Sequence, residues 1–140
     1  NGMPEAVKDR PTRCHEYVFL LTKNPHYFYN SEAIKEETTD GANKRNKRSV
    51  WKINQKPYAG AHFAVFPEEL VKTCMLAGSK EGDLVLDPFV GSGTTGAVAN
   101  KLKRNFIGID LNPDYCIMAE KRIKKENPPC EGGLQQFKID

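Results

Sequence analysis

The chain has 140 residues, of which 39% are hydrophobic and 28% are charged, and it carries a formal net charge of +3. This length and composition favour one globular domain with a buried core over a disordered chain. A cytoplasmic protein is expected, because no apolar run approaches the roughly 18 residues of a membrane span and the N-terminus lacks the apolar core of a signal peptide.

The four cysteines are widely spaced and form no Cys-x-x-Cys pair; they are Cys14, Cys74, Cys116 and Cys130. Three of them lie in apolar or helical patterns, which favours free, buried thiols in a reducing compartment. No metal site is expected.

The first third of the chain mixes an apolar segment with a basic one. Residues 15–22, HEYVFLLT, are β-branched and aromatic and predict a buried strand. Residues 30–48 are polar and predict a surface loop, whereas the alternation in residues 48–53, RSVWKI, predicts a short strand. The loop includes four basic residues that either contact a phosphate backbone or are simply solvated: Lys44, Arg45, Lys47 and Arg48.

The rest of the chain predicts alternating helices and strands. A helix is expected over residues 67–78, because Pro67 suits its first position and Gly78 suits its end. The expected elements that follow are a strand at 83–87, a helix at 93–103, a strand at 105–110 and a helix from Pro113 that Asn112 caps. Short strands separated by single helices predict parallel pairing in a doubly wound α/β sheet. The basic run at 120–126 is interpreted as a solvated face of the last helix.

Residues 85–96, VLDPFVGSGTTG, place Gly91, Gly93 and Gly96 directly after a predicted strand. Ligands of such sheets bind beyond the carboxyl ends of the strands. An ATP phosphate loop is disfavoured, because Ala97 follows Gly96 where that loop needs a lysine. A dinucleotide loop fits the glycine spacing, but the carboxylate of Asp87 would lie close to its pyrophosphate in a partly desolvated cleft. Pro88 also makes this turn longer and stiffer than a dinucleotide turn.

S-adenosylmethionine removes this conflict, because it has no phosphate and carries a cationic sulfonium. Asp87 then attracts charge, and Asp110 is placed to accept both ribose hydroxyls, with a simple helix-entry acid as the alternative role. The N–H groups at the start of the helix can meet the methionine carboxylate, together with the hydroxyls of Ser92, Thr94 and Thr95.

The stretch LDPFVGSGTT resembles motif I of the amino-group DNA methyltransferases, the N6-adenine/N4-cytosine class. Residues 62–70, HFAVFPEEL, resemble motif X of that family, and residues 9–23 resemble the preceding region, which holds a strand near the target-base pocket. The order matches the permuted β arrangement. The resemblance implies a Rossmann-like α/β fold, here partial, with a mostly parallel sheet and helices on both faces.

The resemblance also implies site residues. Cofactor contacts are expected at His62, Phe63, Ala64, Pro67, Asp87, Pro88, Phe89, Gly91, Ser92, Gly93, Thr94, Thr95, Asp110 and Leu111. The base pocket is expected at His15, Glu16 and Tyr17, unless Tyr17 is a core residue and His15 an edge residue. The implied regions are 1–29 for the base-pocket strand, 30–48 for the basic loop, 49–79 for motif X, 80–127 for S-adenosylmethionine binding, and 128–140 for a tail.

The implied activity is transfer of a methyl group from S-adenosylmethionine to adenine N6 or cytosine N4 of double-stranded DNA, in restriction-modification or in phage or host DNA modification. The family's catalytic motif, Asp/Asn/Ser-Pro-Pro-aromatic, does not occur, since NPPC at 127–130 has a cysteine in the aromatic position. We expect that motif upstream of Asn1, and we expect no DNA methylation by this chain alone.

The expected partners are DNA and either the missing N-terminal part or a second copy. Two alternatives stay open: methylation of RNA or protein, and a non-catalytic remnant that binds cofactor or DNA.

Overall fold

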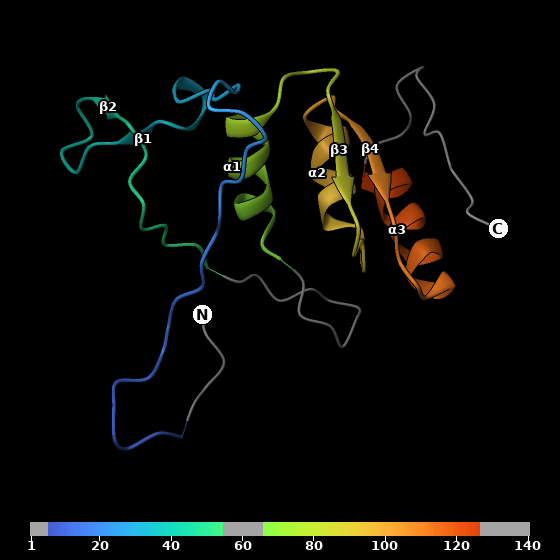
Figure 1. Ribbon diagram of the computed structural model, residues 1–140, viewed down its shortest axis with the longest axis horizontal. Coiled ribbons are helices and arrows are strands. Elements are labelled where there is room, and N and C mark those ends of the chain that lie inside the picture. The colour runs from blue at the N-terminus through green and yellow to red at the C-terminus, as the bar shows by residue number, and fades with distance from the viewer. Residues whose placement is uncertain (1–5, 55–65, 127–140) are drawn as a thin grey trace.

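The computed structural model describes residues 6–54 and 66–126 (Figure 1). The expected cofactor residues His62, Phe63 and Ala64 and the tail at 128–140 lie outside the described residues. Within the described ranges, no helix has the length and apolar character needed to cross a membrane.

The second half of the chain contains the expected alternation of helices and strands. Its elements are α1 (Glu68–Gly78), β3 (Leu84–Asp87), α2 (Thr94–Lys101), β4 (Asn105–Gly108) and α3 (Pro113–Glu126). Each begins and ends within two residues of its predicted bounds where a bound was predicted. The cap predicted for the last helix is confirmed, because Asn112 Oδ1 accepts the Asp114 backbone N–H at 2.9 Å.

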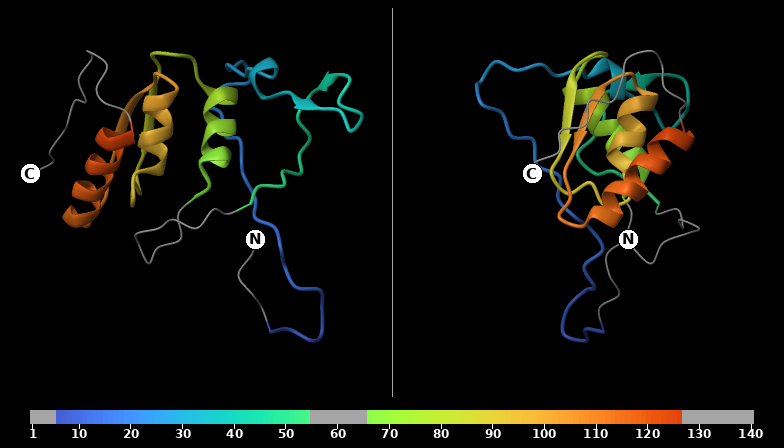
Figure 2. Two further views of the ribbon diagram at one scale, coloured as in Figure 1. Left: turned by 180° about the vertical axis from the view of Figure 1, so that it is seen from behind. Right: turned by 90° about the vertical axis from the view of Figure 1, so that its right-hand side faces the viewer.

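Strands β3 and β4 pair in parallel, with Leu84 opposite Asn105 and Asp87 opposite Gly108. Helix α2 makes the crossover between them, which confirms the predicted parallel β-α-β unit. Figure 2 shows α1, α2 and α3 on one side of this sheet. Val85 points to the helical side and is partly buried, whereas Leu84 and Leu86 on the other face are 61% and 59% exposed.

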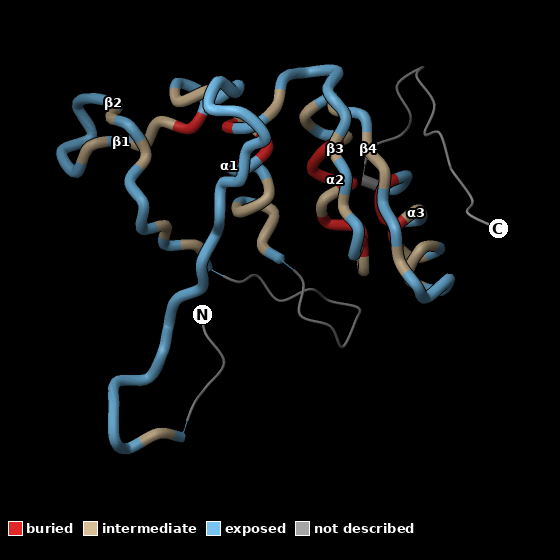
Figure 3. The backbone as a smooth tube through the Cα atoms, viewed as in Figure 1, coloured by how far each residue is buried: buried red, intermediate tan, exposed pale blue. Residues whose placement is uncertain are grey.

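The hydrophobic core lies between the helices and the sheet, and α2 carries much of it (Figure 3). Its buried centre consists of Met75, Val98 and Ala99. Partly buried apolar residues surround that centre: Val71, Val85, Leu102 and Phe106. The core therefore joins α1 to the parallel pair, which sets the position of the loop between β3 and α2.

The first part of the chain differs from the sequence prediction. Residues 15–22 form no strand, and their apolar side chains are exposed, with Phe19 at 76% and Leu21 at 87%. A strand needs a neighbour to pair its backbone N–H and C=O groups, and no described strand lies in register with this segment. The prediction of a buried strand is therefore wrong.

The strand predicted at 48–53 is also absent from the described residues. The Trp51 indole N–H instead donates to the Arg48 carbonyl oxygen at 2.7 Å, which closes a local turn. The preceding polar segment is more ordered than the loop that was expected. It forms a 3-10 helix, η1 (Glu32–Ile34), and an antiparallel hairpin of β1 (Glu36–Glu37) and β2 (Lys44–Arg45).

The described cysteines are free thiols, as expected, but two of them are not buried. Cys14 is exposed in the segment before residues 15–22, and Cys74 is exposed between two residues on the buried face of α1, Thr73 and Met75. Cys116 is partly buried. In the ranges that the structure describes, no group of three or more His, Cys, Asp or Glu residues could hold a metal ion.

Candidate functional site

The glycine loop, residues 87–94, begins at the carboxyl end of β3 and ends at the first residue of α2. Two backbone hydrogen bonds attach it to the end of β4: Ile109 N donates to Asp87 O, and Val90 N donates to Ile109 O, both at 2.9 Å. Because the two strands are parallel, their carboxyl ends meet at one edge of the sheet. Asp87 and Asp110 therefore both lie at this edge, and both are partly buried.

Asp110 holds the loop directly. Its Oδ2 accepts the Gly91 backbone N–H at 3.0 Å, and its Oδ1 accepts the Asn112 backbone N–H at 2.9 Å. An ionised carboxylate has about four acceptor positions, so each oxygen keeps capacity for a further donor. Asp110 thus connects the glycine loop to the start of α3, and the same carboxylate can still accept hydroxyl groups from a ligand.

Asp87 shapes the turn at the end of β3. Its Oδ1 accepts the Phe89 backbone N–H at 3.0 Å, across Pro88. This turn leaves the Phe89 side chain 84% exposed, and Leu111, which follows Asp110, is fully exposed. Two apolar side chains close in sequence to the two acids are therefore available to pack against an apolar or aromatic ligand surface.

The three glycines of the sequence motif, two in the loop and Gly96 in α2, have different roles. Gly91 has φ +48°, and a Cβ placed there would make only an ordinary van der Waals contact, 3.9 Å from the Phe89 carbonyl oxygen. Gly93 has φ +80°, and a Cβ there would lie 2.8 Å from the Ala119 Cα of α3. A Cβ at Gly96 would lie 2.4 Å from Ile123 Cδ1 and 2.6 Å from Phe106 Cε1. Of these glycines, only Gly91 leaves room for a ligand, and the other two permit close packing inside the protein.

The hydroxyl groups of the loop contact an arginine that the sequence interpretation missed. Arg122 Nη1 donates to Thr94 Oγ1 at 2.9 Å and to Ser92 Oγ at 3.3 Å. Arg122 is 8% exposed, so the interpretation of residues 120–126 as a solvated helix face is wrong at this position. Helical spacing could have found it, because Arg122 lies three residues after Ala119 and beside Ile123, both of which are buried.

The start of α1 lies in the same cluster. Pro67 is the N-cap residue of α1, and Glu68 follows it. Glu68 Oε1 accepts from Arg122 Nη2 at 3.3 Å, and Glu68 Oε2 accepts from Lys101 Nζ at 2.9 Å. The segment expected to belong to motif X is thereby connected to the glycine loop through one arginine.

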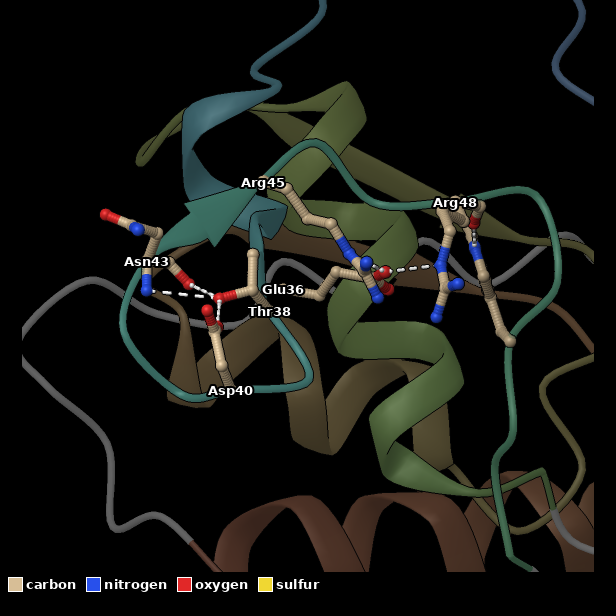
Figure 4. A network of polar contacts seen from close by, with 7 residues as sticks. Glu36, Thr38, Asp40, Asn43, Arg45 and Arg48 are labelled. Atoms are coloured by element: carbon tan, nitrogen blue, oxygen red, sulfur yellow. Dashed lines mark hydrogen bonds and ion pairs between the residues drawn. The ribbon is translucent and has the colours of Figure 1, made fainter.

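The basic residues of the hairpin are partly neutralised by an acid (Figure 4). Glu36 Oε1 accepts from Arg45 Nε at 3.0 Å and from Arg48 Nε at 2.8 Å. Burial raises the pKa of Glu36, but the hydrogen bonds and charges of the two arginines outweigh it, so this pKa lies below its usual value. Lys44 is exposed, and Lys47 Nζ lies 5.3 Å from the centroid of the Trp51 ring.

Side chains close the turn of the same hairpin (Figure 4). The Thr38 hydroxyl donates to Asp40, and the Asn43 backbone N–H donates to Thr38 Oγ1 at 3.1 Å. The hydrogen bond from Thr38 lowers the pKa of Asp40. The hairpin is therefore held by polar contacts at both its turn and its open end.

The expected base-pocket residues lie in the exposed segment. His15 Nε2 is 3.3 Å from the Tyr17 hydroxyl, and the Tyr17 and Phe19 rings have centroids 6.0 Å apart. Tyr17 is 67% exposed, so the alternative that it is a core residue is wrong. Glu16 is exposed as well. Among the described residues, no hydrogen bond or ring contact joins His15, Glu16 or Tyr17 to the glycine loop, and their role at a base stays a prediction.

Comparison with known proteins gives one consistent result. The DNA methylase family profile matches residues 1–121. The type II methyltransferase M.Cfr9I of Citrobacter freundii is 54% identical over 127 residues, which cover 91% of this chain and 42% of that protein. M.SmaI of Serratia marcescens is 54% identical over 124 residues, covering 88% of this chain and 42% of that protein. The chain thus spans less than half the length of these relatives.

One solved structure is similar over two thirds of the chain. The M1.HpyAVI–SAM complex is 29% identical, with a TM-score of 0.49, and the match covers 66% of this chain and 44% of that one.

Proposed function

Since this chain belongs to the DNA methylase family, we propose that its glycine loop binds S-adenosylmethionine as part of a type II DNA methyltransferase. The whole enzyme would transfer the methyl group to the exocyclic amino group of adenine (N6) or cytosine (N4) in double-stranded DNA. The observation that carries this proposal is the pair of acids around an open glycine: Asp110 accepts from Gly91 N at 3.0 Å, and Asp87 ends the neighbouring strand.

The chemistry of this edge fits S-adenosylmethionine better than a nucleotide phosphate. Two carboxylates at a partly desolvated loop repel a pyrophosphate and attract a cation. Gly91 lets a ligand approach the backbone, and Asp110 retains acceptor capacity after its two backbone contacts. When bound, S-adenosylmethionine supplies an electrophilic methyl group on its sulfonium.

The residues at this edge of the sheet have distinct proposed roles. Asp110 accepts hydrogen bonds from the ribose hydroxyls, and Asp87 faces the cationic part of the ligand. Phe89 and Leu111 offer exposed apolar surface to the adenine ring. Ser92 and the N–H groups at the start of α2 receive the methionine carboxylate. Thr94 is 4% exposed, and its hydroxyl oxygen accepts from Arg122, so a direct contact with the ligand is not part of this proposal.

The catalytic residues are proposed to come from the part of the methyltransferase that this chain does not span. The sequence contains no Asp/Asn/Ser-Pro-Pro-aromatic motif, and the chain covers 42% of its relatives' length. The β1–β2 hairpin and the basic residues that follow it are the proposed DNA contact, and Lys44 and Arg48 are its exposed cations. The absence of the motif also favours a second candidate, a module that binds cofactor or DNA without turnover.

Isothermal titration calorimetry with S-adenosylmethionine tests the cofactor site. The wild-type chain is expected to bind, and Asp110→Ala is expected to weaken binding at least about tenfold, because a charge-assisted hydrogen-bond acceptor is lost. Asp83→Ala is the matched control: Asp83 is exposed at the opposite end of β3, and its Oδ2 accepts a local N–H, from Lys80 at 2.8 Å.

Two results would contradict the proposal. One is absence of S-adenosylmethionine binding by a folded wild-type chain. The other is tight binding of NAD at the same loop, since the acids should exclude a pyrophosphate. Thermal unfolding of Asp110→Ala, followed by circular dichroism, separates a lost ligand contact from a lost fold.

A further inference from the structure

Arg122 is a buried cation with an unusual set of partners. Its side chain is 7% exposed, and it contacts Glu68 of α1 together with the two hydroxyls of the glycine loop, Ser92 and Thr94. Burying a guanidinium is costly unless its N–H groups are satisfied. Two of the acceptors that satisfy it here are the neutral hydroxyls beside the proposed ligand site.

The guanidinium determines which way those hydroxyls can donate. Arginine has only donors, so each hydroxyl that contacts it must accept through its oxygen. The hydroxyl hydrogen then points away from Arg122, toward another acceptor. Ser92 is partly buried, whereas Thr94 is 4% exposed, so Ser92 is the one of the two that can present its hydrogen to a ligand.

The guanidinium is also held from its other side. Glu68 accepts from Arg122 Nη2 through Oε1 and from Lys101 Nζ of α2 through Oε2. One carboxylate therefore links α1, α2 and α3, and it orients Nη1 toward the loop. A rigid planar group held at both edges loses less freedom than a flexible ammonium would in the same place.

We propose that Arg122 is a positioning residue, which orients Ser92 as a hydrogen-bond donor to an anionic group of the ligand. This role rests on the proposed function, and the anionic group is the carboxylate of S-adenosylmethionine. Arg122 does not contact the ligand itself. Its buried charge and its contact with Ser92 select a ligand that carries an amino-acid end at the glycine loop.

Calorimetry with two ligands tests this inference on the full chain. S-adenosylmethionine carries the carboxylate, and 5′-deoxy-5′-methylthioadenosine lacks the whole amino-acid end. Arg122→Met is expected to weaken S-adenosylmethionine binding by about tenfold to hundredfold. The same variant is expected to leave methylthioadenosine binding within about twofold. A residue that only held the fold together would weaken both ligands equally.

Two further variants localise the effect. Lys124→Met removes an exposed cation from the same helix, whose Nζ pairs with Glu120 at 3.6 Å, and it is expected to leave both affinities within about twofold. Ser92→Ala combined with Arg122→Met is expected to bind S-adenosylmethionine no more weakly than the weaker single variant, because Arg122 acts through Ser92. Additive losses in the double variant would overturn the inference.

A folding defect does not block the test. If thermal unfolding shows that Arg122→Met is not folded, Arg122→Lys takes its place, because it keeps the buried charge but cannot reproduce the fork of donors. A selective loss of S-adenosylmethionine affinity in that variant supports the inference, and unchanged or equal losses overturn it. If the folded wild-type chain binds methylthioadenosine but not S-adenosylmethionine, the inference and the proposed function both fail. If it binds both and Arg122→Met binds both as tightly, only the inference fails.

Discussion

Residues 66–126 and residues 15–22 use apolar side chains in opposite ways. In the first region, α1, α2 and the β3–β4 pair enclose Met75, Val98 and Ala99. In the second, the most apolar run of the N-terminal region is exposed, with Phe19 at 76% and Leu21 at 87% (Figure 3). Apolar patterning alone therefore did not determine burial; a complementary surface had to be present as well.

The physical difference lies in where the backbone hydrogen bonds go. Apart from its terminal turns, a helix satisfies its own N–H and C=O groups, so α1 and α3 need a packing partner mainly for one face. A strand needs a neighbour for its backbone before any face can pack. β3 and β4 provide this for each other through α2, whereas residues 15–22 have no paired strand among the described residues.

The largest expected effect is on stability. Met75→Ala should lower the free energy of unfolding by about 2–5 kcal/mol, because it opens a cavity in the core. Phe19→Ala should lower it by less than about 0.5 kcal/mol, because that side chain is already in water. Urea unfolding followed by circular dichroism measures both. Equal losses would mean that residues 15–22 are packed in solution and that the two regions do not differ.

A smaller effect on the free energy of unfolding is expected from substituting two glycines in residues 66–126. Gly96→Ala should cost about 1–3 kcal/mol, because its Cβ would overlap Ile123 and Phe106. Gly78→Ala, at the end of α1, meets no atom within 4 Å and should be neutral or stabilising by up to about 1 kcal/mol. The same urea experiment applies. A neutral Gly96→Ala would show that α2 can move away from α3 and β4 at little cost.

The smallest expected effect is on the pKa of Glu36 in the β1–β2 hairpin. The pKa of Glu36 is lowered in the folded chain, so its contacts with Arg45 and Arg48 are fully present above its usual value near 4.5. They should be lost as the pH falls through the lowered pKa. A ¹³C NMR titration of the Glu36 carboxyl should give a midpoint below 4.5. In Arg48→Gln that midpoint should move upward; an unchanged midpoint would mean that the ion pair does not form in solution.

Sequence reasoning located the glycine loop but described its internal contacts incompletely. The order of α1, β3, α2, β4 and α3 followed from apolar periodicity, Pro67, Asn112 and the glycines, all of which act over a few residues. Asp110 was correctly placed at a strand end near the loop. Its contact with Gly91 N could not be read from the sequence, because 19 residues separate the two groups and only parallel pairing brings them together.

Within residues 66–126, the sequence by itself determined the local elements, the parallel β-α-β unit and the presence of two acids at its carboxyl edge, because short-range hydrogen bonding and side-chain periodicity decide these. Tertiary structure decided which glycine has no close neighbour, that Ser92 is more accessible than Thr94, and that Arg122 is buried. Those properties depend on the approach of α1 and α3 to the loop, and packing between distant segments leaves no local signature in the chain.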